Sequence, residues 1–260
     1  MNLLFFGSSD RQLFGAYHAP VARVPARGAA VLCPPWGQEY IVCHRTLRRL
    51  ATRLSERGFH VLRFDYYGTG DSAGEREEGD LSSWYADAEL AVDELRDMSG
   101  QSNVACIGVR LGAVVAWRLG MNRPDVSTVV MWDPVVDGAD YVDELIEGQV
   151  EFARWSLSTR ETYQEPDGTL DLLGFPLTPL MRQSIGSVEP VDFGRAIPAQ
   201  VRLFYSDVLP GRADLLRAFE LAGTTYHSET IAGQMPWHDE TNGAAGLPVD
   251  LIERIVEMMP

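Results

Sequence analysis

Short apolar runs alternate along the chain with segments in which apolar residues recur at helical spacing. The apolar runs predict buried strands at 27–35, 59–64, 103–108 and 127–135. The segments between them predict helices at 45–58, 81–98 and 111–120. An irregular loop is expected at 34–40, and Ser82 or Ser83 is the expected N-cap of the second helix. Strands and helices that alternate in this way predict a mostly parallel sheet with helices on both of its faces.

The alternation is interrupted by an acidic, proline-containing segment, residues 138–199, that has two or three short helical stretches. The alternation then resumes with strands predicted at 200–207 and 224–233 and helices at 211–223 and 247–259. An insertion between two strands of one continuing sheet is expected to cover the carboxyl edge of that sheet, where open α/β folds bind ligands. We therefore predict a core formed by residues 1–137 and 200–260 and a cap formed by residues 138–199.

Composition excludes several classes of protein. The 260 residues carry a net charge of −15, which repels phosphate backbones and anionic lipids and argues against nucleic-acid and membrane-surface binding. The chain contains no lysine for a P-loop, a Schiff base or pyridoxal phosphate. Its three cysteines lack C-x-x-C spacing, which argues against a disulfide framework and a zinc site. No apolar run reaches membrane-spanning length and no basic region precedes the short N-terminal apolar block, so we expect a cytoplasmic protein.

The predicted strand at 103–108 and the helix after it meet at residues 108–112, which read G-V-R-L-G. A strand, two glycines and a helix in this arrangement are typical of a nucleophile elbow, whose pattern is G-x-S-x-G. Arg110 stands where the nucleophile is expected. Residues 70–74 read G-D-S-A-G and match the pattern literally, but a polar run rather than a helix follows them. We therefore expect Ser72 to cap a turn rather than to act as a nucleophile.

With this elbow, the chain resembles the α/β-hydrolase superfamily. The resemblance rests on AVLCPPWG at 30–37, RFDYYGTGDSAG at 63–74, GVRLGA at 108–113, the cap insertion, and a late strand followed by a loop with a histidine. Within the superfamily the chain is most similar to the serine-aminopeptidase-like branch. More narrowly, it is similar to the exosortase-associated hydrolases, some of which also carry G-x-R-x-G and a P-P-x-G-x-E loop. The resemblance implies an α/β-hydrolase fold with a helical cap over nearly the whole chain.

The resemblance also implies roles for individual residues. In this superfamily the oxyanion hole uses the backbone N–H of the residue after the nucleophile and one N–H from the first loop, which points to Leu111 and Trp36. The acid and the base follow the late strands. Those positions point to Asp207 as the acid, with Asp214 as the alternative, and to His238 as the base. The first loop carries two prolines in place of the usual His-Gly, which stiffens it.

Arg110 closes the covalent serine route. A guanidinium has no accessible neutral form, so it cannot act as a nucleophile or as a general base. It also needs an anion, because an unpaired buried charge is strongly destabilising. Glu39, after the first loop, and Asp133, at the end of the strand that follows the elbow, are the internal candidates. The alternative is a substrate carboxylate or phosphate held in bidentate fashion, and both arrangements coexist if Glu39 leaves one edge of Arg110 free.

Three reaction routes remain open on this scaffold. In the first, His238, aided by Asp207, activates a water against an ester or thioester whose oxygen is held by the backbone N–H groups. In the second, His238 or Glu39 moves protons in a lyase, isomerase or cyclase reaction. The third uses a displaced nucleophile, Cys33 or Cys106, and is disfavoured because both lie in predicted strands.

We predict an acyl ester or thioester hydrolase-like enzyme of a biosynthetic pathway that works without a covalent intermediate. The alternatives are a catalytically silent binding or accessory protein and a non-hydrolytic enzyme on the same fold. The expected partner is a small-molecule acyl substrate, carboxylate-bearing or carrier-bound, and a homodimer is one option for the assembly. No cofactor or metal is expected, because the H-D-E run at 238–240 has no second cluster to complete an ion site. Trp155, Tyr163 and Phe175 of the cap are candidates for an apolar wall.

Overall fold

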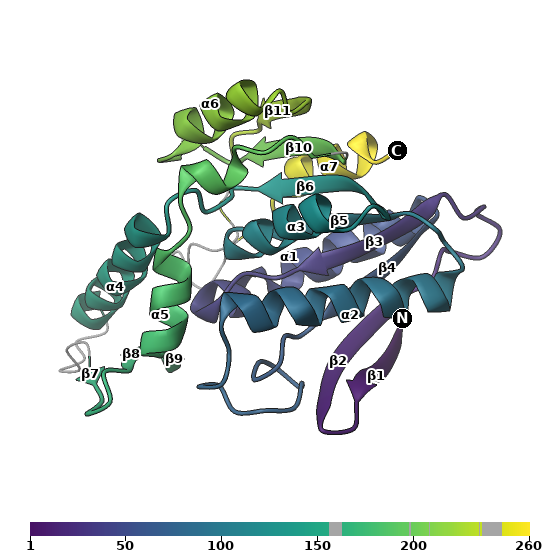
Figure 1. Cartoon of the computed structure of the whole chain (residues 1–260). Coiled ribbons are helices and arrows are strands. Elements are labelled where there is room, and N and C mark those ends of the chain that lie inside the picture. The colour runs from purple at the N-terminus through teal and green to yellow at the C-terminus, as the bar shows by residue number, and fades with distance from the viewer. Residues whose placement is uncertain (156–162, 198, 208, 234, 236–245) are drawn as a thin grey trace.

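An eight-stranded sheet forms the centre of the protein (Figure 1). The computed structural model describes all residues except 156–162, 198, 208, 234 and 236–245, and it does not describe the side chains of 151–155. The strands of the sheet are β1 (Asn2–Ser8), β2 (Arg11–His18), β3 (Gly28–Cys33), β4 (Phe59–Phe64), β5 (Val104–Val109), β6 (Val126–Trp132), β10 (Gln200–Tyr205) and β11 (Tyr226–Thr230). Their spatial order is β1-β2-β4-β3-β5-β6-β10-β11. The pairs from β4 to β11 are parallel, whereas β2 is antiparallel to both β1 and β4.

Helices cover both faces of this sheet, as the sequence pattern predicts. The helices are α1 (Gly37–Glu56), α2 (Leu81–Ser99), α3 (Leu111–Asn122), α6 (Arg212–Ala222) and α7 (Val249–Met258). Apolar residues of α1 and α7 share one buried cluster with one face of the sheet. Apolar residues of α2, α3 and α6 share a second cluster with the other face. Burial of these two sets of apolar side chains is the main force that holds the layers together.

Two helix starts differ from the sequence prediction. α1 begins at Gly37, inside the segment expected to be a loop, because Gly37 adopts a φ of +63° and turns the chain sharply into the helix. α2 is capped by Asp80 rather than by Ser82 or Ser83. The Asp80 carboxylate accepts a hydrogen bond from the Ser83 N–H at 2.7 Å, and the Ser83 hydroxyl accepts one from the Asp80 N–H at 3.0 Å. This reciprocal pair is a capping box, in which the serine occupies the third helical position.

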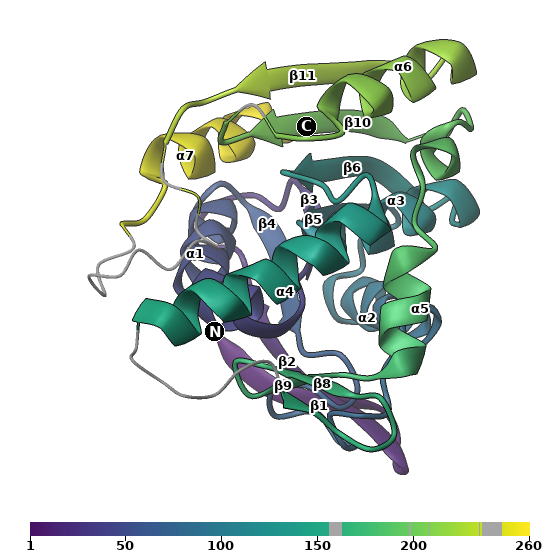
Figure 2. The same cartoon turned by 90° about the vertical axis from the view of Figure 1, so that its left-hand side faces the viewer.

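The segment 138–199 contains more than the helical stretches that the sequence predicts. Its elements are α4 (Gly138–Trp155), β7 (Tyr163–Gln164), β8 (Leu170–Leu172), β9 (Phe175–Leu177), α5 (Pro179–Gly186) and the 3-10 helix η1 (Pro190–Phe193). β7, β8 and β9 form a small antiparallel sheet whose strands of two or three residues are too short to produce a readable pattern. Figure 2 shows α4 and α5 in front of the edge at which the parallel strands end.

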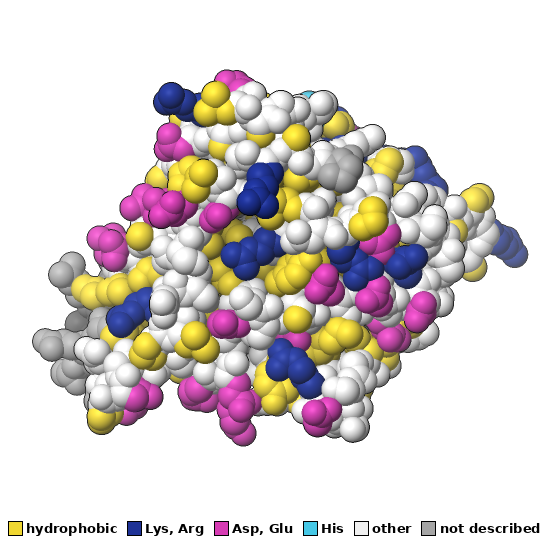
Figure 3. Space-filling model, in the orientation of Figure 1, with side chains coloured by type: hydrophobic (Ala, Val, Ile, Leu, Met, Phe, Trp, Pro, Cys, Tyr) yellow, Lys and Arg dark blue, Asp and Glu magenta, His cyan; other side chains and the backbone are white. Residues whose placement is uncertain are grey.

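Opposite charges are intermixed on the surface. On the face shown in Figure 3, Asp and Glu side chains are spread over the molecule with Arg side chains between them. Among the described residues, no helix is both long and apolar enough to cross a membrane.

Candidate functional site

The turn between β5 and α3 is built around Arg110. β5 ends at Val109 and α3 begins at Leu111, so Arg110 alone joins them, with φ 52° and ψ −120°. A left-handed φ is costly for a residue with a Cβ and is retained only where the surroundings impose it. The strand–turn–helix that the sequence predicts here is therefore confirmed, and its strained residue is the arginine.

Two glycines make this turn possible. A Cβ on Gly108 would lie 2.2 Å from the Gly112 carbonyl oxygen, and a Cβ on Gly112 would lie 2.2 Å from the Cys33 carbonyl oxygen. A Cβ on Gly112 would also lie 2.6 Å from the Pro34 oxygen. The start of α3 is thus pressed against the end of β3, which brings Leu111 close to the segment that leads to Trp36.

The backbone N–H groups of Leu111 and Trp36 lie at the starts of helices. Leu111 is the first residue of α3, and Trp36 is the N-cap of α1. The N–H groups of a first helical turn have no acceptor within the helix and carry the positive end of its dipole. Both N–H groups are therefore hydrogen-bond donors of the kind that an oxyanion site requires, although residue 110 is an arginine and not a serine.

Arg110 is buried between two carboxylates. Its Nε donates to Glu39 Oε1 at 2.9 Å, and its Nη2 donates to both oxygens of Glu144, at 2.7 and 2.6 Å. The arginine is 5% exposed and Glu39 is 6% exposed. The side chain of Glu144 is 52% exposed. One carboxylate is thus a fixed interior partner and the other reaches the guanidinium from the solvent side.

The tyrosine hydroxyl of Tyr141 completes the network. It donates to Glu39 Oε2 at 2.7 Å, and the Arg110 guanidinium carbon lies 5.1 Å from the centre of the Tyr141 ring. Burial alone would lower the pKa of Arg110, but the charges of Glu39 and Glu144 outweigh it and raise that pKa. Burial raises the pKa of Glu39, whereas the charge of Arg110 and the Tyr141 hydroxyl act in the opposite direction. The cation at the elbow is therefore permanent.

Sequence reasoning named Glu39 as a partner of Arg110 but missed Tyr141 and Glu144. Both lie on α4, three positions apart, so they share one face of that helix. This spacing is the only signal in the sequence that could have linked them. The sequence also carries Asp140, Asp143 and Glu147 on the same helix, and the docking of α4 on the elbow selects among them.

Asp133, the other internal candidate, has different partners. It follows β6, is fully buried with a φ of 43°, and accepts bonds from the Ser206 N–H at 2.9 and 3.2 Å. Burial raises its pKa to about 7, against the hydrogen bonds from Ser206 and the charge of Arg110. The ion pairs of Arg110 with described residues go to Glu39 and Glu144 instead.

The other predicted site residues belong to the late strands and the segments that follow them. Asp207 follows β10 at an exposed position, and Asp214 lies exposed in the first turn of α6. His238 and the H-D-E run lie outside the described residues. His227, within the strand predicted at 224–233, is an exposed residue of β11.

The cysteines are inert in this fold. Cys33 and Cys106 are fully buried strand residues. Burial raises the pKa of the Cys33 thiol to about 12 and raises that of Cys106 as well. A protonated, enclosed thiol is a poor nucleophile, which argues against the displaced-nucleophile route. Among the residues that the structure describes, no group of three or more His, Cys, Asp or Glu side chains is arranged to hold a metal ion.

A small cavity adjoins the first loop. Its volume is about 130 Å³, and its lining includes Trp36, Tyr66, Thr69, Trp84 and Phe175. The rings of Tyr66 and Trp84 stack at 4.0 Å, and Phe175 meets Trp36 edge to face at 6.2 Å. Phe175 thus forms part of an apolar wall, as the sequence suggested. The side chains of Trp155 and Tyr163 are outside the described part of the chain.

The tight β5–α3 turn, set in a mostly parallel sheet with helices on both faces, identifies the class: the chain has the α/β-hydrolase fold. The family described as serine aminopeptidase, S33, matches residues 41–169, a stretch that includes Arg110 but neither Asp207 nor His238. A comparison with curated proteins finds no match.

Several solved structures have the same fold over almost the whole chain. Est1E from Butyrivibrio proteoclasticus, with ferulic acid bound, is 15% identical, and the match covers 98% of this chain and 95% of that chain at a TM-score of 0.63. DcsB in complex with its substrate analogue is 17% identical, with 98% and 97% covered at a TM-score of 0.65. XC6422 from Xanthomonas campestris, an α/β serine hydrolase without a lid, is 14% identical, with 98% and 90% covered at a TM-score of 0.59. These identities establish a shared fold.

Proposed function

We propose that the protein is a hydrolase-like enzyme that acts on an acyl ester or thioester. Arg110 binds a carboxylate group of the substrate, and the reaction forms no covalent intermediate. The observation that carries this proposal is the elbow. Its backbone keeps the left-handed turn and the two helix starts at Leu111 and Trp36, while its side chain is a permanent cation. We place the enzyme in a cytoplasmic biosynthetic pathway, in keeping with the expectation from its sequence.

Glu39 and Glu144 bind different nitrogens of the Arg110 guanidinium. Glu39 is buried and is fixed by Tyr141, so it orients the guanidinium. Glu144 is half exposed and both of its oxygens accept from one guanidinium nitrogen, so it occupies the solvent side of Arg110 where an external carboxylate would bind. Displacement of Glu144 by a substrate carboxylate exchanges one ion pair for another, so it exposes no buried charge. This exchange supports a substrate that carries its own carboxylate.

The proposed reaction is direct hydrolysis. His238, aided by Asp207, takes a proton from a water molecule, whose oxygen forms a bond to the acyl carbon. The Leu111 and Trp36 N–H groups stabilise the negative charge that develops on the carbonyl oxygen, and Arg110 adds positive charge near it. The bond to the leaving alkoxide or thiolate then breaks, and the imidazolium returns its proton to that group. Arg110 takes no proton in any step, which is consistent with its chemistry.

The decisive experiment is an activity screen of the wild type beside Arg110→Ala, Arg110→Ser and His238→Ala, with acyl thioesters and esters as substrates. We expect wild-type turnover that falls by at least about 100-fold in Arg110→Ala and His238→Ala, because each removes a group required in the transition state. Wild-type turnover that both alanine variants leave untouched would refute the proposed site. Activity gained only by Arg110→Ser would show that the native protein is not a hydrolase.

Glu144→Gln tests the carboxylate exchange separately. Loss of the competing charge should tighten binding of a short dicarboxylate such as succinate about three- to tenfold, measured by calorimetry. Glu147→Gln is the matched control, because Glu147 is exposed on the same helix. Equal affinities in the two variants would mean that Glu144 does not occupy the ligand position.

A catalytically silent binding protein is the second candidate. The observation in its favour is the 5% exposure of Arg110 beneath two carboxylates, which leaves the elbow filled in the absence of a ligand. Carboxylate binding that Glu144→Gln strengthens, without turnover of any ester or thioester by the wild type, would support this candidate over the enzyme.

A further inference from the structure

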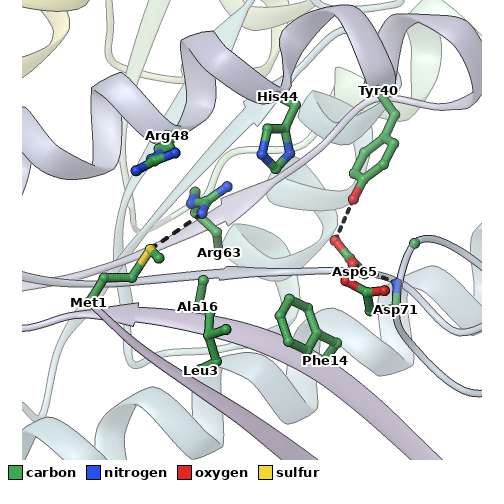
Figure 4. A pocket seen from close by; sticks show the side chains of 11 residues that line it. Met1, Leu3, Phe14, Ala16, Tyr40, His44, Arg48, Arg63, Asp65 and Asp71 are labelled. Carbon is green, nitrogen blue, oxygen red and sulfur yellow. Dashed lines mark hydrogen bonds between the residues drawn. The ribbon is translucent and has the colours of Figure 1, made fainter.

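A larger cavity lies between α1, the β1–β2 hairpin and the loop that follows β4 (Figure 4). Its volume is about 410 Å³, which is within the range of small-molecule sites. Neither Arg110 nor Glu39 lines it. It is therefore a second candidate site, independent of the elbow.

One wall of this cavity is basic. Arg48 comes from α1 and Arg63 from β4, and Figure 4 shows their guanidinium groups near each other, with the His44 ring beside them. Arg63 is half-buried and donates from Nε to His18 Nε2 at 3.4 Å and from Nη2 to the Met1 sulfur at 3.9 Å. Within the described part of the chain, neither Arg63 nor Arg48 forms an ion pair with a carboxylate.

Among the described residues, neither arginine forms an ion pair with an acid, although Asp65 and Asp71 line the same cavity. Acidic residues outnumber basic ones by 37 to 22, and six arginines elsewhere in the described part of the chain form ion pairs with carboxylates. Burial lowers the pKa of Arg63, as expected for a cation that has lost part of its water without gaining a full partner. Burial, followed by the charge of Arg63, lowers the pKa of His18 to about 4, so His18 is a neutral acceptor. An anion placed here would satisfy both guanidinium groups.

Of the two acids that line the cavity, Asp65 has hydrogen-bond partners other than the arginines. Asp65 Oδ1 accepts the Tyr40 hydroxyl at 2.6 Å, and Oδ2 accepts the Asp71 N–H at 3.0 Å. Both carboxylate oxygens are thus occupied at the far end of the cavity, as Figure 4 shows. A Cβ on Gly70 would lie 2.1 Å from Asp65 Oδ2, so only glycine lets this loop close on the carboxylate. The hydrogen bonds of Asp65 thus go to Tyr40 and to the Asp71 N–H rather than to the arginines, although its charge still opposes the effect of burial on the pKa of Arg63.

The literal G-D-S-A-G segment builds one side of this cavity. Ser72 donates to the Asp65 carbonyl at 2.6 Å and accepts the Phe14 N–H at 2.9 Å, which ties the loop to β2. Gly70 of the same segment contributes directly to the lining. Phe14 and Ala16 add apolar surface next to the arginines.

We propose that this cavity binds a small organic oxyanion, a carboxylate or a phosphate monoester, with its charge between Arg48 and Arg63 and its apolar body on Phe14 and Ala16. Two converging guanidinium groups match the oxygens of either anion. The apolar surface beside them favours an anion with an aromatic or short aliphatic group over the bare ion.

Isothermal titration with four probes tests the site: phenyl phosphate, benzoate, inorganic phosphate and benzyl alcohol. We expect phenyl phosphate or benzoate to bind with a Kd below about 1 mM, and benzyl alcohol, which has no charge, not to bind in that range. The aromatic anion with the lower Kd shows whether the cavity prefers a phosphate or a carboxylate group. Inorganic phosphate should bind more weakly than phenyl phosphate, because it lacks the apolar body.

Variants locate the binding. Arg63→Gln and Arg48→Gln should each raise the Kd of the aromatic anion by at least about tenfold, since each removes a charge-assisted hydrogen bond. Arg45→Gln, an exposed position of α1 outside the cavity, should change the Kd less than twofold. A loss of affinity in the Arg48 and Arg63 variants places the anion in this cavity, because Arg110 and Glu39 do not line it.

Wild-type protein that binds neither aromatic anion would overturn the proposal. An affinity that survives in both Arg63→Gln and Arg48→Gln would also overturn it, because the ion would then bind elsewhere. Arg48 is exposed on a helix, so Arg48→Gln remains a valid test if Arg63→Gln does not fold.

Discussion

Arg110 and Glu39 form an ion pair in the interior of the protein, 2.9 Å from Nε to Oε1, although 71 residues separate them in the chain. One residue belongs to the turn after β5 and the other to the first turn of α1. The pair therefore joins two elements that meet only in the folded state. Because both side chains are buried, either one without the other is a desolvated charge.

Glu39→Gln should destabilise the protein by about 3–5 kcal/mol, the cost of removing the buried partner of a buried cation and leaving it only the half-exposed Glu144. Chemical denaturation measures the change. Glu144→Gln is the comparison, because Glu144 pairs with the same arginine from a half-exposed position and should cost less than about 1 kcal/mol. Equal losses in the two variants would contradict the assignment of Glu39 as the interior partner.

Gly112→Ala should destabilise the protein by more than about 3 kcal/mol, because the new methyl group meets backbone oxygens of Cys33 and Pro34 that cannot move independently. Thermal and chemical unfolding report the effect. Gly148→Ala on α4 is the control: its Cβ meets no atom within 4 Å, and it should be neutral or stabilise by up to about 1 kcal/mol. A mild effect at Gly112 would mean that α3 is not pressed against β3.

Asp133→Asn should change how stability depends on pH. The folded-state pKa of Asp133, about 7, lies above its value in an unfolded chain, so the folded protein binds more protons between about pH 4 and pH 7. Stability therefore falls as pH rises through that window, by up to about 1.4 kcal/mol per pH unit from this group.

Asparagine cannot ionise, tolerates the left-handed φ at this position and can still accept the Ser206 N–H. Denaturant melts at pH 5 and pH 8 should show a smaller loss of stability with rising pH in Asp133→Asn than in the wild type. An identical pH dependence would show that this carboxyl is ionised throughout the window.

Ser72→Ala should cost about 1–3 kcal/mol, because it leaves the Phe14 N–H without its acceptor and removes one of the hydrogen bonds that join the loop to β2. Ser82→Ala, at an exposed position of α2, should be within about 0.5 kcal/mol of the wild type. The wild type should resist labelling by a fluorophosphonate at Ser72, detected by peptide mass spectrometry. Labelling at Ser72 would establish that the G-D-S-A-G serine is a nucleophile after all.

The local sequence pattern was enough to predict the strand, the turn and the helix around Arg110. The apolar run before Arg110, the glycines on either side and the helix after it identify the turn without a structure, because strand formation, the turn and helix formation depend on neighbouring residues. The start of α1 was predicted wrongly for a related reason. Gly37 and the prolines before it signal a loop locally, yet the turn they form leads directly into the helix.

By itself, the sequence determined the α/β alternation, the place of the elbow and the fact that its side chain is a cation in need of an anion. Tertiary structure decided which anions those are. Glu39 pairs with Arg110 in the interior, Glu144 pairs with Arg110 from α4, and Asp133 accepts the Ser206 N–H. The physical reason is that a charge selects its partner by distance and burial. Both quantities depend on how α1 and α4 pack across the carboxyl edge of the sheet, and no spacing along the chain encodes them.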